Sequence, residues 1–250
     1  LGVTWKYRDQ HAPAHGDVRF VPFGDLEALR AALGPDVAGL IIEPVQGIGG
    51  IVEPPAGYLE AAQAMVHANG SVLICDEIQS GLGRTGLPLE SRRYGLTPDL
   101  VTVGKGLGGG FPVAALLLTD AMARTVKAGE HGTTFGGAPL ACAAVEATLA
   151  IIEEEGLLEK TARLGELMKA RLAMPGVLEL RGHGAWIGLK LDRPAGPVKD
   201  ALVDRGFLVG TSSDPTVLRL APPVVMPECG VDLLADALAE ILGQGRELVA

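Results

Sequence analysis

Short apolar runs alternate with stretches of helical spacing along the first two thirds of the chain. Four of these runs predict buried strands: Val37–Ile42, Val72–Cys75, Leu100–Val103 and Val113–Leu118. The helical spacing predicts a helix from a capping Asp25 to Leu33, others over Tyr58–Asn69 and Asp120–Lys127, and a long one from Leu140 to about Leu172 with a break near Gly156. This order predicts an α/β fold with a largely parallel sheet.

From Pro175 onward the pattern becomes that of a smaller α+β unit. It predicts strands on both sides of Gly182–Gly184, a helix over Val198–Arg205, strands over Phe207–Val209 and Val217–Leu220, and a helix over Val231–Leu242. We therefore expect a large domain over residues 1–156, a connecting helix over 157–174 and a small C-terminal domain over 175–250.

Composition narrows the class of protein. The 250 residues are 48% hydrophobic and only 20% charged, which is typical of a compact globular chain. The formal net charge of −9 argues against nucleic-acid or anionic-membrane partners, because both select clustered Lys and Arg. No apolar run is long enough to span a bilayer.

The cysteines indicate the cellular compartment, and the N-terminus bears on whether an upstream part is expected. Cys75, Cys142 and Cys229 lie far apart in apolar contexts without CxxC spacing, so we expect reduced core residues of an intracellular, cytoplasmic protein. The chain begins at Leu1 without a signal-like segment, and we expect it to be a fragment that lacks an upstream part.

Three predicted strands of the large unit end in residues that can do chemistry. Glu43 follows the first, Asp76 the second, and Lys105 the third, where Gly104 and Gly106 flank it. Ligands of open α/β sheets bind at the carboxyl ends of strands. Burial there would disfavour the charged form of the amine, and such a lysine can form a Schiff base with an aldehyde.

A buried acid and a buried cation make each other tolerable, and this explains a carboxylate at the end of VLIC. Enzymes that use pyridoxal phosphate need a lysine for the aldehyde and an acid against the pyridinium nitrogen. Asp76 and Lys105 are the candidate pair.

Other interpretations of the same residues stay open at this point. Asp76 alone could be a structural strand-end acid, Lys105 a surface lysine, and Arg219 a partner of a surface acid. The segment 104–109, GKGLGG, formally matches a dinucleotide fingerprint, but that motif needs a helix after it and an acid about 20 residues on. The histidines show no metal-ligand spacing.

Five motifs then occur in one order: EPVQG (43–47), DEIQSGLGRTG (76–86), TPDLVTVGKGLGGGFP (97–112), HGTTFGG (131–137) and LRLAPP (218–223). Together they resemble the class III aminotransferases, most of all those that act on acetylornithine, over nearly the whole chain. The resemblance implies a fold-type-I homodimer with active sites at the subunit interface. It also implies pyridoxal 5'-phosphate as cofactor, an acetylornithine-like ω-amino donor and 2-oxoglutarate as acceptor.

The resemblance also implies roles for residues. Lys105 would hold the cofactor as a Schiff base, and Asp76 would face its pyridine nitrogen, within a cofactor-binding stretch that includes Glu77, Ile78 and Gln79. Gln79 would hydrogen-bond the phenolic oxygen. Thr134 would bind the cofactor phosphate of the neighbouring subunit, Thr133 would lie beside the substrate, and Arg219 would clamp a substrate carboxylate, a task that suits its fork of donors.

The chain also departs from the family pattern. Ile48 stands where members that handle ornithine-like donors usually have a glutamate, and Ala138 replaces a usual asparagine. The glycine/serine phosphate turn and the aromatic residue that stacks on the ring would lie upstream of Leu1. Ornithine, 4-aminobutyrate or carrier-linked lysine transamination, an aminomutase, a nicotinamide oxidoreductase and an inactive fragment therefore remain alternatives.

Overall fold

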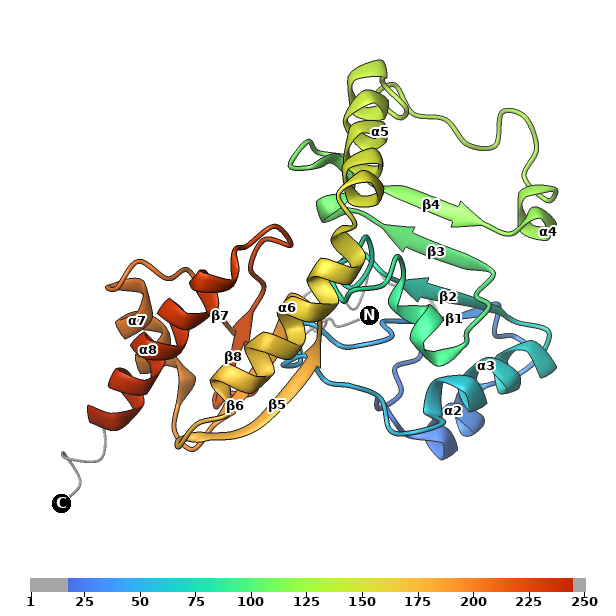
Figure 1. The fold of residues 1–250 in the computed structure, drawn as a ribbon. Coiled ribbons are helices and arrows are strands. Elements are labelled where there is room, and N and C mark those ends of the chain that lie inside the picture. Colours follow the sequence, from blue (N-terminus) through green and yellow to red (C-terminus); the bar gives the residue numbers. More distant parts are fainter. Residues whose placement is uncertain (1–17, 245–250) are drawn as a thin grey trace.

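The computed structural model describes residues 18–244, which fold around two four-stranded sheets (Figure 1). The first sheet has the strand order β1-β2-β3-β4, and the second has the order β5-β6-β8-β7. The first is mainly parallel and is flanked by helices, so the predicted α/β fold is confirmed.

The strands of the first sheet are β1 (Gly39–Ile42), β2 (Val72–Asp76), β3 (Leu100–Val103) and β4 (Ala115–Leu118). The first three run parallel, and β4 runs antiparallel to β3. Parallel strands need crossover connections. The connection from β1 to β2 contains α3 (Tyr58–Ala68), and that from β2 to β3 is a loop with the short 3₁₀ helix Glu90–Tyr94.

The helices beside this sheet begin and end as their sequence predicts. Helix α2 (Leu26–Ala32) is capped by Asp25, whose side chain accepts a hydrogen bond from the backbone of Ala28 at 2.8 Å. Helix α3 ends before Gly70, which has φ +76°. Its buried face packs against β2 in one hydrophobic core, whose buried members are Ile42, Tyr58, Leu59, Val66, Leu73, Cys75, Leu96, Val101, Val103 and Leu107.

Two consecutive helices lead from the first sheet to the second. After α4 (Asp120–Ala123) and a long loop come α5 (Pro139–Glu154) and α6 (Leu157–Leu172). Gly156, with φ +58°, separates α5 from α6, which confirms the predicted break. Figure 1 shows α6 running from the first sheet across the second.

The second sheet consists of β5 (Val177–His183), β6 (Trp186–Leu191), β7 (Gly210–Thr211) and β8 (Val217–Leu220). All its pairs are antiparallel. Helices α6, α7 (Ala195–Val203) and α8 (Glu228–Gln244) bury its core, in which Met168, Leu189, Leu202 and Leu238 are completely enclosed. The predicted domain boundaries at 156 and 174 stay a prediction.

Several sequence expectations differ from the structure. The run Val113–Leu118 was predicted as a buried strand, but all four residues of β4 are exposed, because no described helix covers either of its faces. The predicted strand Phe207–Val209 is wrong, since pairing with β8 begins only at Gly210. Cys75 is buried, whereas Cys142 and Cys229 are exposed free thiols on helices α5 and α8.

A small third core joins the two sheets. Val45 and Ile51, from the loop after β1, pack against Trp186 at the start of β6, and all three are at most 1% exposed. The loop after β1 is therefore held against the second sheet. Within residues 18–244, no helix is long and apolar enough to cross a membrane.

Candidate active site

The carboxyl edge of the first sheet carries the three candidate residues at its strand ends. Glu43 follows the last residue of β1, Asp76 is the last residue of β2, and Lys105 follows β3 by two residues. Strands β2 and β3 are parallel neighbours, and Asp76 is paired with Thr102. Asp76 and Lys105 therefore lie at the same edge of adjacent strands.

The described residues hydrogen-bond to one oxygen of Asp76 and not to the other. Oδ1 accepts hydrogen bonds from the backbone of Ile78 at 3.1 Å and from Thr102 Oγ1 at 3.0 Å. Oδ2 accepts none from the described residues, although the side chain is half-buried. A carboxylate anchored in this way offers one oriented oxygen to a cation, which fits a protonated ring nitrogen.

Lys105 lies in an unusual backbone conformation. It opens a 3₁₀ turn, Lys105–Gly108, with φ +47°, a region that non-glycine residues rarely adopt and that is often found at functional sites. The residue is exposed, so the expectation of burial was wrong, because the flanking Gly104 and Gly106 have no side chains to cover it. Its amine pairs with no described carboxylate, and it therefore fits a covalent partner.

The side chains of Gln79 and Arg219 both approach Gly47. A Cβ at Gly47 would lie 1.9 Å from Gln79 Oε1, so a glycine is needed for the Gln79 amide to approach this closely. Arg219 Nη1 donates to Gly47 O at 3.3 Å, and Glu43 Oε2 accepts from Gly47 N at 3.0 Å. The loop after β1 thus holds a candidate cofactor residue and the candidate substrate clamp close together.

Among the described residues, backbone oxygens position Arg219. Its Nε donates to Thr211 O at 2.7 Å, and no described carboxylate forms an ion pair with it. Partial burial lowers the pKa of the guanidinium below its ordinary value. Ile48, which follows Gly47, is 45% exposed and offers no charge. The guanidinium is therefore open to an anionic ligand, and a carboxylate matches its fork of donors.

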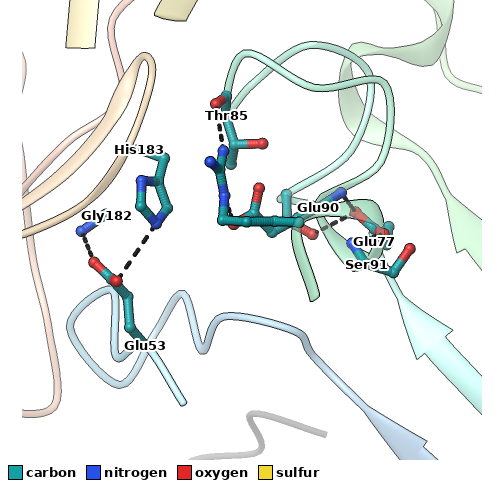
Figure 2. A network of polar contacts seen from close by, with 9 residues as sticks. Glu53, Glu77, Thr85, Glu90, Ser91, Gly182 and His183 are labelled. Carbon is teal, nitrogen blue, oxygen red and sulfur yellow. Dashed lines mark hydrogen bonds and ion pairs between the residues drawn. The ribbon is translucent and has the colours of Figure 1, made fainter. Parts of the chain in front are cut away.

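Glu77 requires a correction. The sequence placed it among the cofactor-binding residues, but its side chain is 1% exposed and satisfied by protein groups (Figure 2). Oε2 accepts from the backbone of Glu90 and from Ser80 Oγ, and Oε1 accepts from the backbone of Ser91. The carboxylate therefore caps the 3₁₀ helix Glu90–Tyr94 and is not available to a cofactor.

Ile78 contributes through its backbone and its bulk. Its N–H holds Asp76, and its side chain lies beside Gly104, where a Cβ would be 3.6 Å away. Neither contact gives its side chain a polar role towards a ligand.

The two threonines lie apart from these groups. Thr133 and Thr134 are exposed in the extended loop between α4 and α5, at the upper right of Figure 1, and neither hydroxyl bonds to a described residue. Phe135, directly after them, is 84% exposed. The described structure does not bring them to Asp76 and Lys105, and their roles stay predictions.

Three residues of the site escaped sequence reasoning. Thr102 fixes Asp76, Gly47 admits Gln79, and the ring of Trp186 closes on Gly47, where a Cβ would lie 2.8 Å from Cζ2. Only the register of β2 with β3 could have indicated Thr102. The contacts of Gly47 with Trp186 and Arg219 join segments more than 100 residues apart, which no local pattern reveals.

Two other chemistries find no support in residues 18–244. No group of three His, Cys, Asp or Glu side chains there could hold a metal ion. The nicotinamide alternative needed a helix opening at Gly108–Gly110, but the 3₁₀ turn there leads into β4. No helix N-terminus is present at that place for a pyrophosphate.

Glu53, in the segment between β1 and α3, makes polar contacts with two residues of β5 (Figure 2). Glu53 Oε1 accepts from the backbone of Gly182, and Oε2 lies 3.4 Å from His183 Nε2. The hydrogen bond from His183 is the main reason why the pKa of Glu53 falls from 4.5 to about 2.

The comparisons with known proteins agree on one protein family. A family model described as aminotransferase class-III matches residues 3–242. The acetylornithine aminotransferase of Streptomyces coelicolor is 44% identical over 240 residues, covering 94% of this chain and 60% of the relative. That of Methanothermobacter thermautotrophicus is 37% identical over 242 residues, covering 95% and 62%. The chain thus spans about three fifths of the length of the curated relatives it matches.

Solved structures agree. The ornithine aminotransferase of Toxoplasma gondii, in a structure that reports partial occupancy of PLP at the active site, has a TM-score of 0.82 and 30% identity, covering 95% of this chain and 60% of that one. The acetylornithine aminotransferase of Elizabethkingia anophelis has a TM-score of 0.81 and 28% identity, covering 90% and 62%.

The substitution Glu77→Gln should destabilise the protein by about 1.5–3 kcal/mol, because it places an amide donor against backbone donors in a buried site. Urea unfolding followed by circular dichroism measures the change. Glu153→Gln, on the exposed face of α5, is the matched control and should stay within about 0.5 kcal/mol of the wild type. Equal effects of the two substitutions would contradict the capping role.

The Glu53 contact should make stability fall in acid. A depressed pKa means that the contribution is complete above pH 4.5 and is lost as the pH falls towards 2. The side chain is 38% exposed, so we expect only about 1 kcal/mol after solvent screening. The difference in free energy of unfolding between wild type and Glu53→Gln should shrink as the pH falls from 4.5 towards 2. A difference that grows on acidification would contradict a stabilising role of the Glu53 carboxylate.

Proposed function

The chain belongs to the class III aminotransferases, and from this premise we propose that the protein transfers the amino group of acetylornithine or a similar ω-amino donor to 2-oxoglutarate, with pyridoxal 5'-phosphate as cofactor. One observation carries the proposal more than any other. The second oxygen of Asp76 and the amine of Lys105, neither of which has a partner among the described residues, belong to residues at the same edge of two adjacent parallel strands.

Each residue has a defined task in this proposal. When bound, pyridoxal phosphate supplies an aldehyde for the amino group and a ring that accepts the electrons of the substrate C–H bond. Asp76 Oδ2 would keep a proton on the ring nitrogen, which favours an electron-poor ring. Lys105 Nζ would hold the aldehyde group and would carry a proton to or from the substrate carbon that bears the amino group. Gln79 would hydrogen-bond the phenolic oxygen.

The substrate end of the site is supported by Arg219. Its guanidinium has no carboxylate partner among the described residues and is set by Thr211 O and Gly47 O, so it is arranged for a substrate carboxylate. Ile48 beside it adds apolar surface without a competing negative charge. The names of the relatives favour acetylornithine as donor, and the ornithine aminotransferase structures make ornithine the second candidate.

We further propose that the protein works as a homodimer with shared active sites. Thr134 would hold the cofactor phosphate of the partner, and Thr133 would lie beside its substrate. The exposed loop that carries them and large exposed apolar side chains nearby support this arrangement: Leu116, Leu117, Phe135, Leu140 and Leu149. The working division remains a large domain over 1–156, a connecting helix over 157–174 and a small domain over 175–250.

Lys105→Ala should abolish the visible, borohydride-sensitive absorption band that a lysine-bound cofactor gives, because no other amine would lie at the end of β3. Absorption spectra with and without borohydride measure this, with circular dichroism to verify the fold. Lys127→Ala, in an exposed position beyond α4, is the control and should keep the band. A persistent band in Lys105→Ala would point to another lysine, and a wild type without any band would contradict the cofactor.

Asp76→Asn should retain the cofactor and lower turnover by about 10²–10³-fold, because the neutral amide cannot hold the ring nitrogen in its protonated form. Single-turnover kinetics with glutamate as donor separate this effect from binding. Asp120→Asn, at the exposed start of α4, should leave the rate unchanged. Near-normal turnover in Asp76→Asn would remove Asp76 from the mechanism.

A further inference from the structure

Arg84 connects the loop after Asp76 with two segments of the second sheet. Its Nη1 donates to Ala185 O at 3.0 Å and also to Pro222 O. In return, the backbone N–H of Ala185 donates to Arg84 O at 3.0 Å. Arg84, Ala185 and Pro222 belong to three separate stretches of the chain, and one residue thus holds them in fixed relation.

The charge of Arg84 is not neutralised by any described acid. Its side chain is half-buried, no described carboxylate pairs with it, and burial lowers the pKa of the guanidinium below its ordinary value. Withdrawing a cation from water without a counter-ion is costly, so simple filling of space would favour an apolar residue. The directional bonds to two carbonyl oxygens are what a guanidinium provides here and an apolar side chain cannot.

Glycines let the same segments meet backbone to backbone. A Cβ on Gly184 would lie 2.6 Å from the carbonyl carbon of Thr85 and 2.8 Å from Arg84 O. A Cβ on Gly165, in α6, would lie 2.6 Å from Gly184 N, and one on Gly86 would lie 2.9 Å from Ala162 Cβ. The junction of the loop, the β5–β6 turn and α6 has no room for adjustment.

The junction lies between the two halves of the candidate site. Pro222 follows Arg219 by three residues, just after β8. Ala185 precedes Trp186, whose ring closes on Gly47, the residue that Gln79 and Arg219 both approach. The bonds of Arg84 therefore tie the segment that carries Asp76 and Gln79 to the segment that carries Arg219.

We propose that Arg84 is a positioning residue, which sets the substrate-clamping Arg219 at the right separation from Asp76 and Gln79. This inference rests on the proposed transaminase function. In this proposal Arg84 acts through protein groups, the carbonyl oxygens of Ala185 and Pro222, and not through the cofactor or the substrate. Loss of the Arg84 side chain would remove its hydrogen bonds to two carbonyl oxygens at the junction and allow Arg219 to shift. Small displacements of a group that positions the substrate have large effects on binding and rate.

The test compares Arg84→Met, Arg84→Lys and the control Arg193→Met. Arg193 also donates to a carbonyl oxygen, that of Leu242, but its contacts lie within the C-terminal part of the chain. In Arg84→Met we expect the KM for 2-oxoglutarate to rise about tenfold or more while cofactor affinity changes less than about threefold. Arg84→Lys should be intermediate because it keeps the charge and can reach one carbonyl, and Arg193→Met should keep the KM of the wild type.

Hydrogen exchange supplies a readout that needs no activity. The amide of Ala185 should exchange faster in Arg84→Met than in wild type or in Arg193→Met, because its acceptor is the backbone oxygen of residue 84. If Arg84→Met does not fold, Arg84→Lys carries both measurements. A purely structural role predicts lower thermal stability with unchanged KM and would overturn the inference. A wild type without turnover contradicts the proposed function instead, while the exchange comparison still decides whether Arg84 couples the segments.

Discussion

The parallel pairing of β2 with β3 is the constraint on which the candidate site depends. Strands that run in the same direction deliver their carboxyl ends to one edge, and the pairing of Asp76 with Thr102 brings a hydroxyl to the carboxylate. The hydroxyl and the N–H of Ile78 hold one oxygen of Asp76, and the other oxygen accepts no hydrogen bond from the part of the chain that the structure describes. A slip of this register by one residue would turn Asp76 towards the opposite face and remove the anchor.

The second sheet matters because it supplies Arg219 from a distant part of the sequence. Its placement does not follow from the first sheet. It depends on the small core of Val45, Ile51 and Trp186 and on backbone contacts that only glycines permit. Ile51 itself has φ +57°, an unfavourable conformation for a β-branched residue, yet it is fully buried. The joint between the sheets thus stores strain that the surrounding packing has to balance.

Sequence patterns predicted elements well where local physics decides them. The run Leu100–Val103 matches β3, the cap at Asp25 forms, and Gly156 separates two helices. The sequence patterns gave wrong predictions where the burial of a residue depends on which other segments cover it. An apolar run such as Val113–Leu118 indicates that a strand can be buried, but not that a described element covers it. Likewise, Lys105 was expected to be buried, although its exposure depends on what lies above the sheet edge.

The two consecutive acids, Asp76 and Glu77, have different roles although they are neighbours in one motif. Successive side chains at the end of a strand point to opposite faces. Glu77 is directed inward, where backbone N–H groups of Glu90 and Ser91 make a buried charge tolerable. Within residues 18–244, Asp76 accepts hydrogen bonds at only one oxygen, and it retains the capacity to bind a cation. The inward acid bonds to both ends of the loop that contains Arg84 and so shapes it, whereas Asp76 keeps one oxygen that no described residue engages.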